Sequence, residues 1–471
     1  MSDRTVITAM TALDLAARYR DGSLSPVEAT QACLDRIGEL DGAVNAFVLV
    51  DADGALAAAA AAQERFAGGA PLGRLDGVPV AIKDLLLTQG WPTRRGSRTI
   101  DANQPWPEDA PSVGRLRDGG AILIGKTTTP ELGWKGVTDS PLTGITRNPW
   151  GLDRTPGGSS GGSSAAVAAG MVPLALGTDG GGSIRIPAAF SGIVGHKPTY
   201  GRVALHPPSP YGTLAHIGPM ARTSTDAAAL LDVISGVDGR DPTSFPSPRI
   251  GPLEPADLHG RRVGVCLAQS VCPTDPDVAA AFDASVDWFA DQGAIVEPID
   301  LPLDGLLEVF ETLWFAGAAA ALAANPADRA LMDPGLVEIE QIGRAVDAVG
   351  YLAAQQARTQ FAARVAARFE TIDVLLTPTV PIVAFAGGVE VPTGWPHTRW
   401  TTWTPWTWAF NLTQQPAVSV PCGVSGGGLP IGLQVVAARH DDARALAWAA
   451  AFETDRPVEF PPGVRAVRGH S

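Results

Sequence analysis

The sequence has few cysteines, and their positions form no recognisable framework. Its 471 residues include Cys33, Cys266, Cys272 and Cys422, and no two of them have the C-x-x-C spacing of a zinc ribbon or a redox site. A disulfide-rich scaffold is also excluded, because such scaffolds are short chains dense in cysteine. We therefore expect free, buried thiols.

Basic charge is scarce as well. Asp and Glu number 49 against 35 Lys and Arg, which gives a formal net charge of −14 at pH 7. Because affinity for a phosphate backbone depends on basic side chains, we expect no binding to nucleic acid. Only four lysines occur, at Lys83, Lys126, Lys135 and Lys197.

Segments typical of a leader peptide or a membrane span are also missing. The chain begins MSDRTVITAMTALDL, which lacks the basic region, apolar stretch and cleavage site of a signal peptide. The longest uncharged stretch, between Arg154 and Asp179, is mostly Gly, Ser and Ala and includes Pro173, a poor composition for a membrane-spanning helix. We expect a cytoplasmic protein that does not act at a membrane.

Apolar residues are plentiful and follow alternating helical and strand patterns. Hydrophobic residues make up 45% of the chain and charged residues 18%, enough for a large core. Ser25 and Glu28 predict a capping box at the start of a helix, and residues 55–66 are strong helix formers. Short β-type runs lie at 78–82, 121–124, 172–176, 262–266, 374–377, 417–420 and 431–435. This alternation predicts an α/β fold.

Two well-known motifs match the sequence without their structural context. Residues 120–127 fit the P-loop pattern, but its four variable positions are Ala, Ile, Leu and Ile, which predict a strand instead of a flexible phosphate loop. Residues 157–161 fit the G-x-S-x-G nucleophile elbow, but no strand-like run leads into them. The sequence contains no S-x-x-K or H-E-x-x-H motif, and its seven histidines have no metal-ligand spacing. We expect neither a nucleotide site, nor an α/β-hydrolase site, nor a metal.

Three other segments carry residues suited to acyl transfer. Lys83 ends an apolar strand-like run, residues 156–164 (PGGSSGGSS) form a serine-rich loop, and residues 178–185 (TDGGGSIR) place three glycines before Ser183. Consecutive glycines leave backbone N–H groups free to converge on one oxygen, as an oxyanion hole requires. A lysine and several serines together are candidates for nucleophilic catalysis.

At these segments the sequence resembles the amidase signature family. The most specific block is residues 156–203, and residues 77–87, 146–160, 417–423 and 429–436 are also similar to that family. The likeness covers roughly residues 7–455. It implies an α/β/α sandwich around a large mixed β-sheet, in a single domain over residues 1–471. The signature core falls at about 70–220, and a helical subdomain at about 255–365 is expected to be inserted before the C-terminal strands.

The resemblance implies a Ser–cis-Ser–Lys triad. The nucleophile falls on Ser183, the bridging serine on Ser159 and the base on Lys83, and a cis peptide bond is expected before Ser159. The oxyanion hole falls on the backbone N–H groups of Gly180, Gly181, Gly182 and Ser183. The family implies no metal and no organic cofactor.

The implied chemistry requires a neutral lysine. Ser183 would attack a carbonyl carbon while Ser159 passes its proton to Lys83. A free lysine, with a pKa of about 10.4, is neutral in only about one molecule in a thousand at pH ~7.4, so burial among the apolar neighbours must lower this pKa. Asp84 should point away from the amine, as strand alternation allows. Asp179 and Arg185, which flank the nucleophile, are expected to form an ion pair that fixes the loop.

The segment 395–408, which we call the Trp-rich segment, contains five of the twelve tryptophans. These rings could simply pack in the core, but Pro405 interrupts the segment and the spacing gives no single helical stripe, so a rim or lid fits better than core. Trp134, Trp395, Trp400 and Trp403 are candidates for an apolar wall of the substrate pocket. This wall and the low charge favour a small, neutral, apolar or aromatic substrate.

The expected function is that of an amidase that hydrolyses a C–N bond, with anilides, esters and carbamates open to the same chemistry. The alternatives within the family are a carbamate hydrolase (a urethanase) and an amidotransferase A-type subunit. The family's Ser-Leu-Asp-Gln stretch is replaced here by residues 213–216, Thr-Leu-Ala-His, which disfavours a tRNA-linked role. A catalytically inactive binding protein is disfavoured because Lys83, Ser159 and Ser183 are all present. A homodimer is expected from the family alone.

Overall fold

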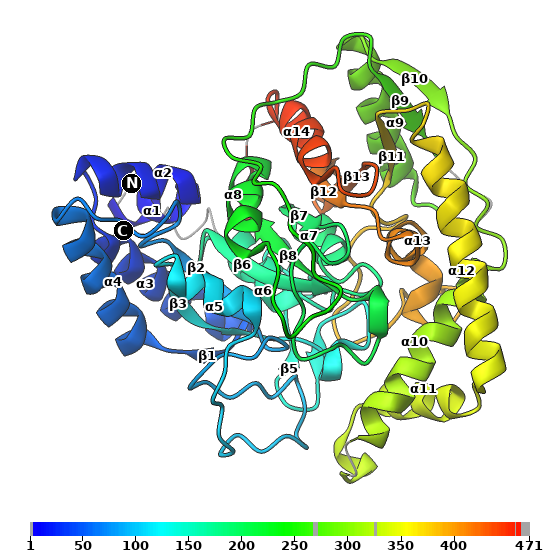
Figure 1. Cartoon of the computed structure of the whole chain (residues 1–471), viewed down its shortest axis with the longest axis horizontal. Coiled ribbons are helices and arrows are strands. Elements are labelled where there is room, and N and C mark those ends of the chain that lie inside the picture. The colour runs from blue at the N-terminus through cyan, green and yellow to red at the C-terminus, as the bar shows by residue number, and fades with distance from the viewer. Residues whose placement is uncertain (1–2, 267–271, 325–326, 457, 463–471) are drawn as a thin grey trace.

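The strands of the computed structural model, which describes residues 3–266, 272–324, 327–456 and 458–462, form an 11-stranded mixed sheet (Figure 1). Their spatial order is β1 (Phe47–Val50), β3 (Ile122–Thr127), β2 (Pro79–Lys83), β6 (Leu174–Asp179), β8 (His216–Ala221), β7 (Val194–Lys197), β12 (Ala417–Val424), β13 (Pro430–Val436), β11 (Val374–Pro378), β9 (Arg262–Val265) and β10 (Ile295–Pro298). Strand β2 is parallel to β3 and β6, whereas the neighbours from β6 to β11 are antiparallel. A separate hairpin joins β4 (Asp139–Ser140) to β5 (Gly144–Ile145).

Helices cover both faces of this sheet. One face packs against α2 (Ala12–Asp21), α5 (Pro111–Asp118), α8 (Ser224–Ile234), α9 (Pro276–Asp291) and α14 (Asp442–Glu453). The opposite face packs against α3 (Pro26–Val44), α4 (Ala52–Ala67), α6 (Gly161–Ala168), α7 (Arg185–Ser191), α10 (Leu306–Ala323), α12 (Ala348–Arg368) and α13 (Pro405–Thr413). Helix α1 (Asp3–Ala9) lies beside α3, and α11 (Pro334–Arg344) packs on α10. The predicted α/β/α sandwich is confirmed.

Local sequence signals account for many of these elements. Ser25 and Glu28 form the capping box that starts α3. In β2 the side chains alternate, so that Val80 and Ile82 join the core on the α8 side and Ala81 joins the core on the α6 side. Lys83 is in phase with Ala81 and therefore enters the layer between the sheet and α6.

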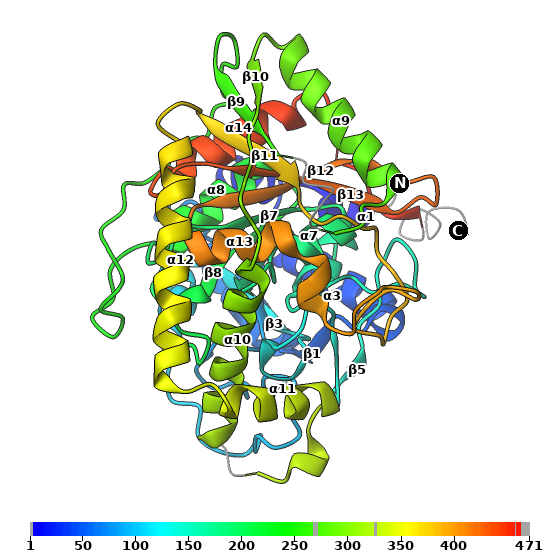
Figure 2. The same cartoon turned by 90° about the vertical axis from the view of Figure 1, so that its right-hand side faces the viewer.

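The C-terminal half first continues the sheet and then forms a group of helices. Strands β9 and β10 fall inside the range 255–365 but extend the main sheet, because β9 pairs in parallel with β11. The helical part is therefore shorter than expected and consists of α10, α11 and α12, which lie together in front of the sheet in Figure 2. By length and composition α10 could span a membrane, and half of it is buried in this structure.

The Trp-rich segment is core, so the prediction of a rim or lid is wrong. Its rings at Trp400, Trp403, Trp406 and Trp408 are at most 2% exposed. A 3-10 turn at Trp400–Trp403 is followed at once by α13, which begins at Pro405, and the two short helices together bury rings that point in different directions. The absence of one helical stripe therefore did not indicate exposure.

Candidate active site

Lys83 is fully buried at the end of β2 and contacts hydroxyl groups. Its Nζ lies 2.8 Å from Ser159 Oγ, 2.8 Å from Ser160 Oγ and 2.8 Å from Thr178 Oγ1. Burial lowers the pKa of Lys83 well below its ordinary value, and the negative charge of Asp179 opposes this shift only in part. A lysine with these surroundings can lose its proton and become a base.

The carboxylate next to this lysine points elsewhere, as expected. Asp84 Oδ1 lies 3.3 Å from the ammonium nitrogen of Lys126, and both side chains are almost completely buried. Strand alternation thus gives Asp84 a different lysine as its partner, and it does not stabilise the charged form of Lys83 directly.

The serine-rich loop is held tightly between neighbouring backbones. The Gly158–Ser159 peptide bond is cis, as the family resemblance implied. A Cβ at Gly158 would lie 2.5 Å from the carbonyl carbon of Val137, so only glycine fits there. The Ser160 N–H donates to the Ser183 carbonyl oxygen at 3.1 Å, which joins this loop to the loop of the expected nucleophile.

The loop of residues 180–183 connects β6 to α7 and presents backbone donors. The N–H groups of Gly180, Gly181 and Ser183 donate to no group among the described residues. The N–H of Gly182 instead donates to Asp179 Oδ1 at 2.9 Å. Three of the four predicted oxyanion donors are therefore free, and the inclusion of Gly182 is corrected.

Aromatic rings pack directly behind this loop and explain its glycines. A Cβ on Gly180 would lie 2.7 Å from the Trp314 ring, and one on Gly181 would lie 2.7 Å from the Trp400 ring. Gly182 has φ +127° and would bring a side chain into Thr407. Any larger residue at these positions would displace the loop or the core behind it.

A buried ion pair fixes the two ends of the loop, as expected. Arg185 Nη2 lies 2.8 Å from Asp179 Oδ1 and Arg185 Nε lies 3.0 Å from Asp179 Oδ2, with neither side chain exposed. Burial alone would raise the pKa of Asp179, but the charge and hydrogen bonds of Arg185 outweigh it and keep this pKa well below its ordinary value. The guanidinium also donates to Asn411 and Gln434 at 2.7 Å each, so the C-terminal half supports the loop.

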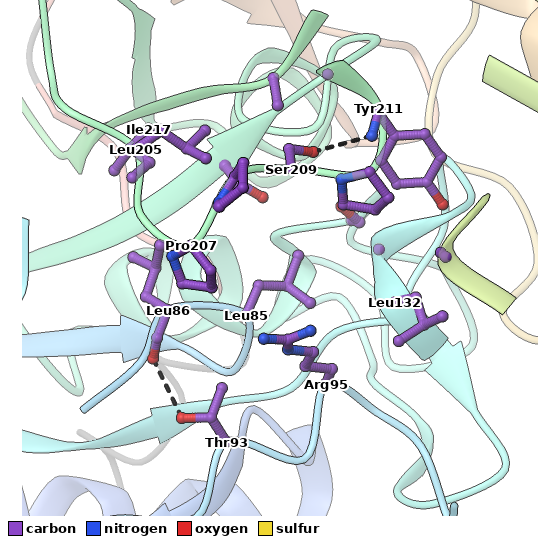
Figure 3. Close-up of a pocket in the computed structure, with 18 of the residues that line it drawn as sticks. Leu85, Leu86, Thr93, Arg95, Leu132, Leu205, Pro207, Ser209, Tyr211 and Ile217 are labelled. Atoms are coloured by element: carbon purple, nitrogen blue, oxygen red, sulfur yellow. Dashed lines mark hydrogen bonds between the residues drawn. The ribbon is translucent and has the colours of Figure 1, made fainter. Parts of the chain in front are cut away.

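A cavity of about 700 Å³ opens onto these residues. Ser159, Thr178, Gly180 and Ser183 line it, and most of the remaining wall is apolar. Figure 3 shows the labelled residues around this space, with the Arg95 side chain directed toward its interior. The size suits a small organic substrate.

The prediction of the pocket tryptophans is wrong. The cavity wall, as far as the described residues form it, includes none of Trp134, Trp395, Trp400 and Trp403. The indole rings of Trp134, Trp400 and Trp403 are buried in the core, and the half-buried Trp395 donates its Nε1–H to Thr402 Oγ1 at 2.8 Å. The cavity takes its aromatic surface from Trp314, Trp106 and Tyr211.

Sequence reasoning also missed two hydroxyl groups that contact the lysine. The sequence places Ser160 in the serine-rich loop and Thr178 at the start of residues 178–185, and neither position indicates a contact with Lys83. Ser160 Oγ accepts from the Thr178 N–H at 3.2 Å and donates to the Thr178 carbonyl at 3.2 Å, so the two residues form one unit. The only signal was their place within the two glycine-rich segments, which does not reveal side-chain direction.

Comparisons with known proteins identify the family of the chain. The family model described as Amidase matches residues 28–446. The chain is 39% identical to the A-type subunit of the glutamyl-tRNA(Gln) amidotransferase of Salinispora tropica, over 98% of this chain and 100% of that protein.

Two solved structures are similar over nearly their whole length. A bacterial aryl acylamidase of the amidase signature enzymes superposes with a TM-score of 0.90 at 30% identity, covering 98% of this chain and 99% of that one. A 6-aminohexanoate cyclic dimer hydrolase complexed with substrate superposes with a TM-score of 0.88 at 29% identity, covering 98% and 100%.

Proposed function

The chain belongs to the amidase signature family, and from that premise we propose that it cleaves an amide C–N bond through an acyl-enzyme on Ser183. In this proposal Ser159 relays protons and Lys83 is the base. The observation that carries the proposal is the buried Lys83 amine, 2.8 Å from the Oγ of Ser159, which lines the same cavity as Ser183.

Acylation begins when Ser183 Oγ attacks the substrate carbonyl carbon. The Ser183 proton moves to Ser159 Oγ, and the Ser159 proton moves to the neutral Lys83 amine. Negative charge then develops on the former carbonyl oxygen, which the free N–H groups of Gly180, Gly181 and Ser183 can bind. One such donor contributes roughly 2.7–4 kcal/mol to transition-state stabilisation.

The intermediate collapses by breaking the C–N bond. The proton held by Lys83 returns through Ser159 to the leaving nitrogen, which departs as an amine or ammonia. Water then attacks the acyl-Ser183 ester while Lys83 again accepts a proton through Ser159. As the acid leaves, this proton returns through Ser159 to Ser183 Oγ, which restores both serines and the neutral lysine. The cycle leaves the enzyme unchanged and consumes one water.

The cavity supports a small substrate with an apolar or aromatic body. Trp314 and Tyr211, whose ring centroids lie 3.7 Å apart, provide a flat apolar surface beside Gly180 and Ser183. The same acyl-enzyme chemistry serves anilides, esters and carbamates, so urethane cleavage falls within this proposal. The similarity to an aryl acylamidase supports an aromatic group in the substrate.

A second candidate is an amidotransferase A-type subunit, which the full-length similarity to such proteins supports. The catalytic step at Ser183 would be the same, but the released ammonia would pass to a partner protein. The replacement of the family's usual residues by Thr213–His216 supports the stand-alone hydrolase instead.

A mixed-pool hydrolysis assay read by mass spectrometry tests the proposal. The pool contains glutamine and aliphatic and aromatic primary amides, anilides, esters and aryl carbamates, and wild type is compared with Ser183→Ala. Products formed only by wild type support the triad, and their masses identify the substrate class. Turnover by Ser183→Ala at the wild-type rate would overturn it. Ammonia release from glutamine alone would favour the amidotransferase candidate.

A further inference from the structure

Arg95 is a charged side chain in the mostly apolar wall of the cavity. It is partly buried, it lines the cavity, and its guanidinium donates to no described residue and pairs with no described carboxylate. In Figure 3 the guanidinium lies beside Leu85 and points toward the interior of the cavity. Arginine has five donors in a planar fork, so an arginine without a partner in such a place has unused binding capacity.

The backbone holds Arg95 in this position. Its φ is +54°, in the left-handed region that a non-glycine residue seldom occupies, and it is followed by Gly96 with φ +67°. The Arg95 carbonyl accepts the Leu132 N–H at 2.8 Å, and Leu132 also lines the cavity. A Cβ on the next residue, Gly133, would lie 3.3 Å from Ser159 Oγ, so this wall adjoins the proposed triad.

The surrounding charges leave Arg95 uncompensated within the cavity. No Asp or Glu is among the described residues that line it. The negative charge of Asp84 acts on the pKa of Arg95, but the Asp84 carboxylate forms its ion pair with Lys126. His206, the other basic residue of the wall, lies 3.6 Å from Glu108. Burial lowers the pKa of Arg95 and Asp84 opposes this, yet arginine stays charged at any physiological pH.

We propose that Arg95 binds a carboxylate on the substrate, so that the preferred substrate is an amide whose apolar or aromatic body carries an acid group. This inference rests on the proposed amide hydrolysis and replaces the expected neutral substrate by an anionic one. A carboxylate would accept two parallel N–H bonds from the guanidinium, and the low polarity of the wall strengthens such charge-assisted bonds.

Two matched pairs of substrates test the proposal on either side of the scissile bond. The 4-nitroanilides of glutaric acid and of pentanoic acid differ by a carboxylate in the acyl group. N-acetyl-4-aminobenzoate and acetanilide differ by a carboxylate in the leaving group. The proteins are wild type, Arg95→Gln, Arg95→Lys and the control Arg98→Gln, which changes an exposed arginine three residues away.

In at least one pair we expect wild type to prefer the carboxylate substrate and Arg95→Gln to lower its kcat/KM about ten- to a hundredfold. The kcat/KM of the neutral partner should stay within about twofold, Arg95→Lys should recover part of the loss, and Arg98→Gln should behave as wild type. An equal fall for both members of a pair, or no wild-type preference in either pair, would overturn the role of Arg95 while leaving the amidase proposal intact.

A binding measurement separates this inference from the failure of the proposed function. Calorimetry compares 4-phenylbutyrate with 4-phenylbutanamide in Ser183→Ala and in Ser183→Ala/Arg95→Gln. We expect the Arg95 substitution to weaken the acid at least tenfold and to leave the amide unchanged. Equal affinities of the acid for the two proteins would refute the inference even if no pool substrate is turned over.

Discussion

The groups around its amine distinguish Lys83 from two other buried lysines, Lys126 and Lys135. Lys126 lies 3.3 Å from Asp84, and Lys135 lies 2.7 Å from Asp139 and 2.8 Å from Asp333, so carboxylates stabilise both cations. Lys83 has three hydroxyl groups instead. Hydroxyls can donate to a neutral amine as well as accept from an ammonium ion, which suits Lys83 to proton transfer.

The first prediction at this scale concerns the pH dependence of turnover. Because the pKa of Lys83 is lowered and its neutral form is the base, kcat/KM should rise with pH through that pKa and level off above it. The rise should lie at lower pH than a free lysine, with a pKa of about 10.4, would give. A pentanoyl 4-nitroanilide, which does not titrate, serves as substrate. A profile that is flat from about pH 6 to about pH 10 would contradict the role of Lys83.

The second prediction concerns Ser160, a positioning residue for that lysine. Ser160→Ala removes one hydrogen bond from Lys83 and should lower kcat about ten- to a hundredfold. Since a lost acceptor disfavours the ammonium form, the midpoint of the pH profile should also move to lower pH. Ser140→Ala, which changes a buried serine of the β4 strand, is the matched control. A fall in kcat with an unmoved midpoint would indicate a structural effect alone.

At the scale of elements, the site is formed by two glycine-rich loops, one just before α6 and one between β6 and α7. Their loop character and the strands beside them were predictable, because apolar runs such as 78–82 and glycine clusters are local signals. The packing behind them was not, since it depends on contacts such as Trp314 with Gly180 and Trp400 with Gly181, between residues far apart in the chain. For the same reason the Trp-rich segment was misplaced, and Arg95, whose direction depends on a positive φ, was overlooked.

The third prediction tests the element between β6 and α7. Asp179→Asn leaves the buried Arg185 guanidinium without its counter-charge and should lower the free energy of unfolding by about 3–5 kcal/mol. It should also lower kcat, because the Gly182 N–H loses its charged acceptor and the loop loosens. Asp153→Asn changes an exposed acid 3.2 Å from Arg154 and should cost about 0–1 kcal/mol. Similar losses for both variants in urea denaturation would refute this account of the loop.

At the scale of the whole molecule, residues of the C-terminal half of the chain support the site that the N-terminal half forms. The proposed triad comes from β2 and the loops around α6 and β6, but Asn411 and Gln434 contact Arg185 from the C-terminal half. The same halves meet again where α14 packs against α8, and there Glu453 accepts the Ser224 N–H at 2.9 Å. Sequence patterns could not predict the order of the strands or these contacts between distant residues, whereas the resemblance to the family predicted the layered fold.

The last prediction concerns the junction of α14 with α8, where Glu453 accepts the Ser224 N–H. Burial raises the pKa of Glu453 to about 8, the Ser224 hydrogen bonds oppose the shift, and the charge of Asp226 adds to it. Between the ordinary glutamate pKa of 4.5 and about 8, the folded protein therefore keeps a proton that the unfolded chain releases. Stability must then fall as pH rises across this window, because the unfolded state binds fewer protons.

Glu453→Gln mimics the protonated side chain and should remove this dependence. Near pH ~5 the two proteins should melt at similar temperatures, and the Tm of the variant should exceed that of wild type increasingly as the pH rises to ~8. Glu459→Gln, at an exposed position six residues on, should leave the Tm of wild type unchanged at every pH. A Tm difference between wild type and Glu453→Gln that stays constant with pH would mean that Glu453 is ionised in the folded protein, with Ser224 stabilising the charged form at this junction.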